Sequence, residues 1–103
     1  MLHVIATIEI EAGKRAEFLA IFTKWLTPLV LAEDGCIEYG AAIDTPTHSP
    51  MQVPLRPDVV TVVEKWANLD ALNAHSKAPH MAEYRVKISG LVKKVALQIM
   101  EPV

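Results

Sequence analysis

The sequence predicts an α+β fold, a ferredoxin-like split βαβ sandwich with the order strand, helix, strand, strand, helix, strand (βαββαβ). Two observations carry this prediction. Apolar residues recur every second position in four segments of the 103-residue chain, and every third or fourth position in the segments between them. The helical segments stand second and fifth in this order, so both can cover one face of a single sheet. We therefore expect one domain over residues 1–103, long enough to bury a hydrophobic core.

The first strand and helix are predicted from a change of apolar period. Residues 2–10 alternate apolar and mixed positions, which is typical of a strand, and Gly13 follows in a turn. From residue 14 the apolar side chains form one helical stripe, so we expect a helix over residues 14–32. Pro28 lies inside it and crowds the carbonyl of Lys24, so the last turn should kink or restart.

The second and third strands are expected over residues 36–43 and 59–66, the latter rich in β-branched residues. Between them, residues 44–58 hold four of the seven prolines of the chain, which disfavour regular strand pairing. A connection of this length is a mobile surface loop, a lid or an interface arm, and the sequence leaves these alternatives open.

The second helical region is predicted in two parts. Asn68 is a suitable N-cap for a helix over residues 69–77, and Pro79 ends that helix and begins the next, which runs to about residue 89. A last strand over residues 94–100 closes the fold, with three apolar side chains on one face: Val95, Leu97 and Ile99.

The sheet face away from the helices also carries apolar positions, among them Ile5, Val59 and Val63. A sheet that left these in water would risk aggregation, so we expect a homodimer that packs sheet against sheet. An apolar fraction of 51% agrees with a buried subunit interface.

Charge and composition exclude several classes of protein. The net charge is −2 and no basic stripe is present, which disfavours nucleic-acid binding. No apolar run approaches the length of about 18 residues that crosses a bilayer. Cys36 is the only cysteine and no leader-like segment opens the chain, so we expect a cytoplasmic protein.

The candidate site residues cluster in the third strand and the helices after it. Trp66 shares a strand face with Glu64, either as a core residue or as the flat wall of an aromatic site whose indole N–H binds a substrate oxygen. His75 should point inward, and the break at Pro79 brings His80 and Tyr84 toward it. An inward histidine is often only a hydrogen-bonded core residue, but three such groups together also fit a site.

Several short motifs follow one another in order along the chain: Met1-Leu2-His3-Val4-Ile5-Ala6, Gly13, Glu33-Asp34-Gly35-Cys36, Pro57-Asp58, Glu64-Lys65-Trp66, Ala74-His75, Pro79-His80-Met81 and Tyr84. Together they resemble the antibiotic biosynthesis monooxygenase family, and within it the bacterial quinol monooxygenases. The resemblance implies a dimeric α+β barrel with a pocket between sheet and helices. It also implies oxidation of an electron-rich aromatic by dioxygen without a bound cofactor.

Two departures weigh against haem. Haem-degrading members carry an asparagine on the first strand where this chain has Ala6, and their ligand histidine falls near Arg85. Fold membership alone does not fix the chemistry of a member.

A quinol is deprotonated before it gives an electron to dioxygen, and a neutral imidazole suits that step. We expect His75 to act as the base, with His80 as second candidate. A tyrosine hydroxyl, from Tyr84 or Tyr39, would hold the other oxygen, and Met81, Phe22 and Leu26 would supply a dry wall.

Other functions remain open at this point. The same histidines could move protons in an isomerase for a small carbonyl compound, or the chain could be a non-catalytic ligand-binding dimer. No metal site is expected, because His75 and His80 are five residues apart across a helix break and Cys36 has no partner cysteine.

Overall fold

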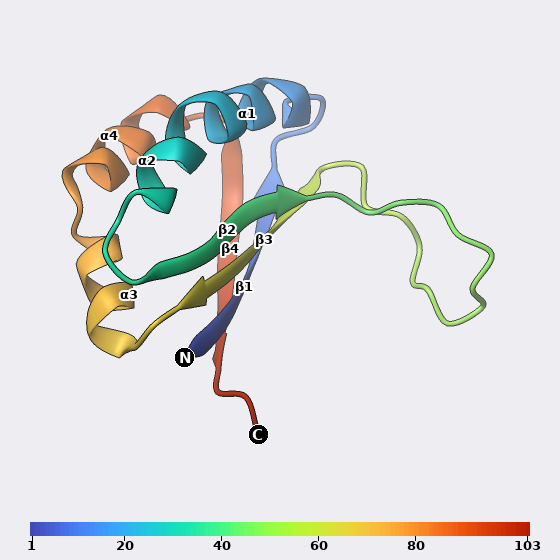
Figure 1. The fold of residues 1–103 in the computed structure, drawn as a ribbon. Helices are drawn as coiled ribbons and strands as arrows, with labels where there is room; N and C mark the ends of the chain where they lie inside the picture. The colour runs from blue at the N-terminus through green and yellow to red at the C-terminus, as the bar shows by residue number, and fades with distance from the viewer.

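The computed structural model describes residues 1–103 and has the expected α+β architecture, with the helices gathered on one face of a sheet (Figure 1). The elements in chain order are β1 (Leu2–Ile10), α1 (Arg15–Ile21), η1 (Phe22–Leu26), α2 (Thr27–Leu31), β2 (Cys36–Ala42), β3 (Val59–Trp66), α3 (Leu69–Ser76), α4 (Pro79–Lys87) and β4 (Val92–Met100). The four strands form one antiparallel sheet in the order β2-β3-β1-β4. The predicted ferredoxin-like sandwich is therefore confirmed.

The central strand β1 separates a buried face from an open one. Its helix-facing residues Val4, Ala6, Ile8 and Ile10 are buried, as the alternation predicts. On the other face Ile5 lies opposite Val63 of β3 and is only half-buried. The apolar residues that suggested a sheet-to-sheet contact therefore do lie together on the uncovered face.

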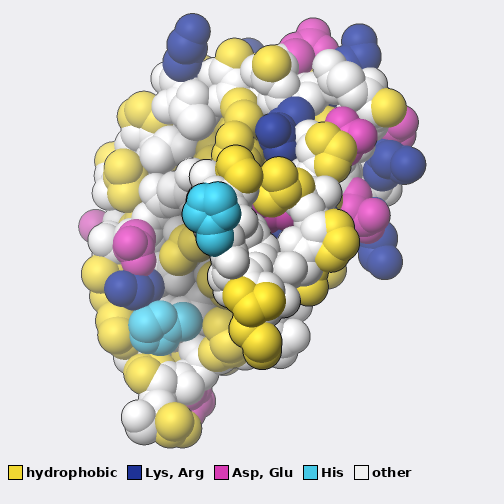
Figure 2. Space-filling view, turned by 90° about the vertical axis from the view of Figure 1, so that its right-hand side faces the viewer, with side chains coloured by type: hydrophobic (Ala, Val, Ile, Leu, Met, Phe, Trp, Pro, Cys, Tyr) yellow, Lys and Arg dark blue, Asp and Glu magenta, His cyan; other side chains and the backbone are white.

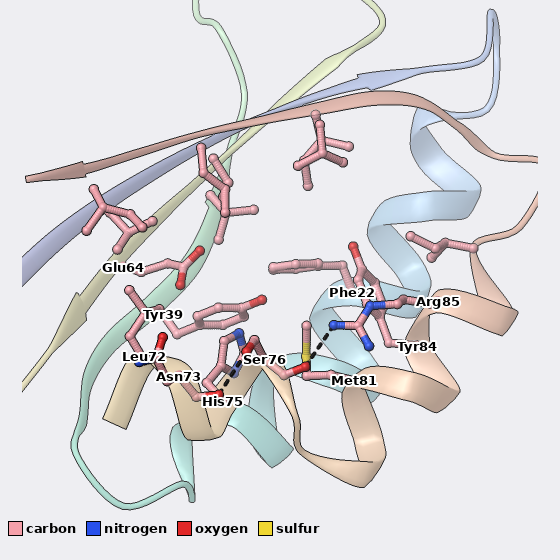
Figure 3. A pocket seen from close by; sticks show the side chains of 18 residues that line it. Phe22, Tyr39, Glu64, Leu72, Asn73, His75, Ser76, Met81, Tyr84 and Arg85 are labelled. Carbon is pink, nitrogen blue, oxygen red and sulfur yellow. Dashed lines mark hydrogen bonds between the residues drawn. The ribbon is translucent and has the colours of Figure 1, made fainter. Parts of the chain in front are cut away.

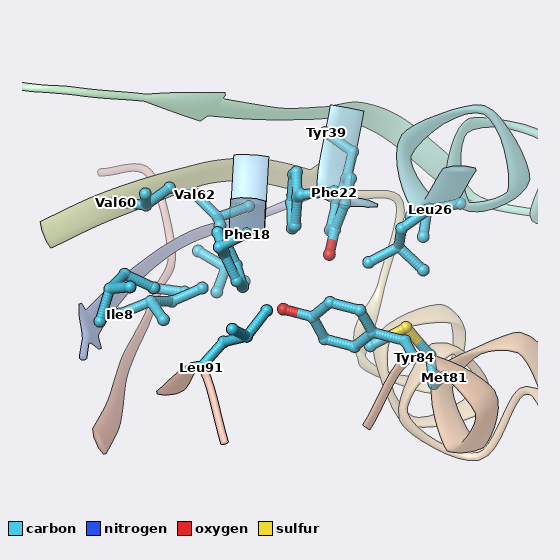
Figure 4. Packing of buried hydrophobic residues seen from close by; sticks show 14 of the residues in the cluster. Ile8, Phe18, Phe22, Leu26, Tyr39, Val60, Val62, Met81, Tyr84 and Leu91 are labelled. Atoms are coloured by element: carbon cyan, nitrogen blue, oxygen red, sulfur yellow. The ribbon is translucent and has the colours of Figure 1, made fainter. Parts of the chain in front are cut away.

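Aromatic side chains fill the space between the helices and the sheet (Figure 4). Phe22 stacks on Phe18 with ring centroids 5.7 Å apart, and on Tyr39 of β2 at 5.4 Å. Tyr84 of α4 meets the edge of the Phe22 ring at 6.2 Å. These contacts join α1, η1, α4 and β2 around one aromatic cluster.

The first helix is irregular in the way that Pro28 demands, but the irregularity comes earlier than the last turn. Phe22–Leu26 form a π-helical turn, in which the amide and the hydroxyl of Thr27 both bond the carbonyl of Phe22. The wider turn makes room before Pro28, which has no N–H to donate and begins α2. It also keeps Phe22, Leu26 and Val30 buried on one side of the helix.

The turn that follows α2 is fixed by close contact with α3. Gly35 has a φ of +81°, and a Cβ at this position would lie 2.6 Å from the Cβ of Ala71. Only glycine fits both requirements without strain. This contact holds the two residues before Gly35, Glu33 and Asp34, close to α3.

The two-part helical region agrees with the sequence prediction. The side chain of Asn68 accepts a hydrogen bond from the amide of Ala71 at 2.9 Å and so caps α3, and Pro79 is the first residue of α4. No helix in the fold has the length and apolar character that a bilayer crossing needs.

The edge strand β4 begins two residues earlier than predicted, because Val92 pairs with Ile10 across an irregularity in the register. On the helix-facing side, Val95, Leu97 and Ile99 pair with Ile8, Ala6 and Val4, yet remain 52%, 59% and 47% exposed. The helices thus cover β1, β2 and β3 but leave β4 open.

The loop between β2 and β3 projects from the body as an arm, away from α3 and α4 (Figure 1). Its base is closed by Asp44, whose carboxylate accepts hydrogen bonds from the Arg56 side chain at 2.8 and 2.9 Å and from the Arg56 amide at 3.0 Å. Met51 and Val53 are 88% and 66% exposed. Hydrophobic side chains are visible on the side of the molecule from which the arm projects (Figure 2). The arm does not cover the space under the helices of its own chain.

Candidate active site

A cavity of about 590 Å³ lies between the sheet and the helices α3 and α4 (Figure 3). Thirteen of its 18 lining residues are hydrophobic. The helix-facing side chains of β1 and β4 form one wall, and Phe22 lines it from η1. Its volume falls in the range of about 300–1,000 Å³ that is usual for small-molecule sites.

His75 is the polar group of this cavity with the most defined position. Its side chain is buried, and its ring lies 4.6 Å from the ring of Trp66 and 5.6 Å from that of Tyr39. The Nδ1 atom lies 2.8 Å from Oε2 of Glu33. Because a carboxylate can only accept, Nδ1 carries the proton and Nε2 is left as an acceptor on a ring that borders the cavity.

Glu33 joins the two histidines that the sequence singled out. Its Oε2 accepts from His75 and also from Nε2 of His80, at 2.7 Å. His80 is half-buried and does not border the cavity, so of the two histidines on this carboxylate oxygen only His75 lines the cavity. The three donor atoms lie within 4.8 Å of one another, which makes this group the one candidate metal-ligand set of the chain.

Trp66 does not border the cavity, so its position agrees with the core alternative and not with the wall of an aromatic site. It is fully buried, and its indole N–H is donated to Oε1 of Glu64 at 2.9 Å. The physical reason is local: residues 64 and 66 share one face of β3, which brings the buried carboxyl beside the indole. Trp66 therefore packs against the His75 ring and donates a hydrogen bond to Glu64, without reaching the cavity.

Glu64 itself borders the cavity. Burial raises the pKa of its carboxyl, and the nearby Glu33 raises it further, whereas the hydrogen bond from Trp66 and the His75 ring lower it. The net effect is upward. Glu64 therefore holds a proton more readily than an ordinary glutamate.

Tyr39 and Tyr84 present their hydroxyls toward the cavity (Figure 3). Neither hydroxyl has a hydrogen-bond partner within the protein. Burial is the largest cause that raises the pKa of both phenols, and the charge of Glu64 adds to it. Both residues are therefore protonated hydrogen-bond donors that a ligand can use.

Part of the cavity lining is polar and was not expected from the sequence. Arg85 donates from Nη2 to the carbonyl of Ser76 at 2.9 Å and so ties α4 to α3, and the Ser76 hydroxyl donates to the carbonyl of Asn73 at 2.8 Å (Figure 3). The helical spacing of Met81, Tyr84 and Arg85 was the available signal, because residues three and four apart share a helix face. Met81 and Phe22 line the cavity, as expected of its dry wall, whereas Leu26 is buried in the core and does not border it.

Cys36 is not suited to thiolate chemistry. Burial, followed by the charges of Glu33 and Glu64, raises the pKa of its thiol to about 11. It remains a free thiol.

The fold and the cavity together define a ferredoxin-like α+β domain with a mostly apolar cavity between its sheet and helices. The family model described as antibiotic biosynthesis monooxygenase matches residues 1–87, and the chain belongs to this family. It is 34% identical over 104 residues to the Escherichia coli (strain K12) protein named "Probable quinol monooxygenase YgiN", a match that covers 99% of this chain and 98% of the relative.

Solved structures share the fold over almost the whole chain. The structure of PA3566 from Pseudomonas aeruginosa has a TM-score of 0.78 at 22% identity and covers 99% of this chain and 93% of that one. Rv0793 from Mycobacterium tuberculosis has a TM-score of 0.77 at 24% identity, with 99% and 94% covered. The strand β4 lies beyond the part matched by the family model, yet pairs along the full length of β1.

Proposed function

We propose that this protein oxidises a quinol or a similar phenolic aromatic with dioxygen, without a bound cofactor. One observation carries the proposal: an aromatic-lined apolar cavity is bordered by a buried histidine whose Nδ1 contacts a carboxylate, which leaves Nε2 free to accept a proton. The name of the Escherichia coli relative supports the same class of substrate.

The proposed reaction starts with removal of a phenolic proton by Nε2 of His75. The quinol anion then gives one electron to dioxygen, and the resulting superoxide and semiquinone join in a carbon–oxygen bond. Cleavage of the oxygen–oxygen bond leaves a hydroxyquinone and one water, so one quinol and one dioxygen are consumed. The electrons come from the substrate itself, which explains why no cofactor is needed.

The protein's part is to hold and move protons in a dry space. Glu33 fixes the His75 tautomer through the 2.8 Å contact to Nδ1 and stabilises the imidazolium that forms. The hydroxyls of Tyr39 and Tyr84 donate to the developing phenolate, and the apolar wall raises the strength of these bonds by excluding water. A protonated Glu64 can return a proton to the departing oxygen.

The test is dioxygen uptake with reduced menadione, measured above the uncatalysed rate. His75→Ala should abolish the catalysed uptake, whereas Lys14→Ala, an exposed residue outside the cavity, should leave it unchanged. Uptake that equals autoxidation at every protein concentration contradicts the proposal. Turnover of a carbonyl substrate under anaerobic conditions would favour the isomerase instead.

We also propose a homodimer in which the open sheet faces of two copies meet. The half-buried Ile5 and Val63 lie opposite each other at the centre of that face, and the arm exposes Met51 and Val53 beyond it. Sedimentation should give a dimer mass, and Val63→Glu should shift the protein toward the monomer. A cytosolic setting fits the free thiol of Cys36.

A further inference from the structure

We propose that Glu33, His75 and His80 bind one divalent transition-metal ion of the zinc type. Two imidazole nitrogens and a carboxylate oxygen are a donor set that such ions prefer. The three atoms come from three places in the chain, the turn after α2, α3 and α4, and still lie within 4.8 Å of one another.

The donor group is built into the fold rather than scattered on the surface. The side chains of Glu33, His75 and His80 are only 13%, 8% and 19% exposed. Gly35 and Ala71 hold the Glu33 turn against α3, and Pro79 starts α4 so that His80 lies in its first turn. The ligands are therefore largely positioned before an ion arrives, which lowers the cost of ordering them on binding.

The distances show what binding must change. The two contacts to Glu33 Oε2, at 2.8 and 2.7 Å, are hydrogen bonds. In a tetrahedral site with metal–ligand distances of about 2.0–2.1 Å, neighbouring ligand atoms lie about 3.3 Å apart. The carboxylate oxygen must therefore withdraw from each ring by roughly half an ångström, and the two ring nitrogens, which lie within 4.8 Å of each other, must approach by up to roughly 1.5 Å through rotation of the side chains.

Three protein ligands leave a coordination position for water or another ligand. His80 is the most exposed of the three and marks the route by which an ion enters from solvent. Cys36 is not expected as a fourth ligand, because the raised pKa of its thiol, about 11, opposes the thiolate that zinc requires.

Metal binding has a consequence for the cavity. An ion on Nδ1 of His75 moves that ring's proton to Nε2, so the ring nitrogen that is not bound to the ion changes from acceptor to donor. This part rests on the proposed function, since a histidine that already carries a proton on Nε2 cannot take one from a quinol. We therefore expect Zn²⁺ to inhibit the oxidation reaction by binding Nδ1 of His75, the proposed base.

The primary experiment measures binding and needs no activity. Chelator-treated full-length protein is titrated with Zn²⁺ by calorimetry, and with Co²⁺ by visible absorption, which reports a site of low coordination number. We expect one ion per chain. His80→Ala should weaken binding by at least about a hundredfold, since loss of an outer-sphere partner alone commonly costs about 10- to 100-fold.

His48→Ala is the matched control, because His48 is exposed on the arm and makes no side-chain hydrogen bond. It should bind the ion as the unchanged protein does. Glu33→Gln keeps the shape of the side chain but removes its charge, so it should weaken binding without unfolding the protein. Circular dichroism checks that each variant is folded.

Nitrogen-15 spectra of the histidine rings give an independent signature. Without metal we expect protons on Nδ1 of His75 and Nε2 of His80, and with Zn²⁺ on the opposite nitrogens. No binding to the unchanged protein, binding that survives both His80→Ala and Glu33→Gln, or unshifted ring protons would each overturn the proposal. If quinol oxidation is absent but the ion binds as described, only the proposed function fails.

Discussion

Gly35→Ala tests whether the turn after α2 positions the site through contact with α3. The new residue would have to adopt a φ of +81°, which costs an alanine about 1–2 kcal/mol. Its Cβ would also lie 2.6 Å from the Cβ of Ala71, and overpacking of this kind costs about 1–3 kcal/mol. The sum, about 3 kcal/mol, corresponds to a fall in Tm of about 15 °C for a domain of this size.

Two further variants separate the terms. Gly13→Ala has nearly the same backbone conformation, with a φ of +77°, but no atom within 4 Å of the added Cβ, so it should show the backbone cost alone. In the double variant Gly35→Ala with Ala71→Gly, the steric part should be recovered. Thermal and urea unfolding of the four proteins measures each step. Equal losses for Gly13→Ala and Gly35→Ala, or no rescue by Ala71→Gly, would refute the reasoning.

Other changes have expected outcomes of a simpler kind. Because the folded-state pKa of Glu64 is raised, stability should fall as the pH rises above the ordinary value of 4.5, and Glu64→Gln should remove this fall in urea titrations at pH 5 and pH 8. Asn68→Ala should lower the free energy of unfolding by about 1 kcal/mol through loss of the α3 cap, and no change in Tm would contradict that role. The hydrogen bonds from Arg56 lower the pKa of Asp44 to about 2, so the stabilisation from this pair is present above pH 4 and is lost as the pH falls toward 2. Proteolysis of the arm should therefore rise as the pH falls over that range. Asp44→Asn should be cleaved at pH 7 as readily as the unchanged protein is at pH 2.

The parts of the fold that the sequence predicts well are those governed by local pattern. β1 and β3 have the predicted bounds because their alternation is strict and turn residues flank them. The π-helical turn at Phe22–Leu26 was not predictable, since Pro28 shows that the helix must be irregular but not where. The burial of the aromatic cluster decides that, through tertiary contacts.

The site divides in the same way. His75 could be placed from its helical spacing to Leu72, and it borders the cavity. Glu33 could not, because it lies 42 and 47 residues from its two partners and locally forms an ordinary turn. The two alternatives for Trp66 could not be separated from the sequence for a related reason: the alternation places Trp66 beside Glu64, but it does not show that the indole N–H is donated to that carboxyl.

The edge strand β4, which no helix packs against, forms the part of the cavity wall that is most easily opened by local unfolding. Val95, Leu97 and Ile99 of β4 form part of its wall, and no helix packs directly against them. An edge strand with little tertiary cover opens by local unfolding at lower free energy than the centre of a sheet, so amide hydrogen exchange should be faster in β4 than in β1. A ligand that packs against these three side chains would slow that exchange, and a probe of backbone protection in β4 would detect occupancy of the cavity even for a compound that is never turned over.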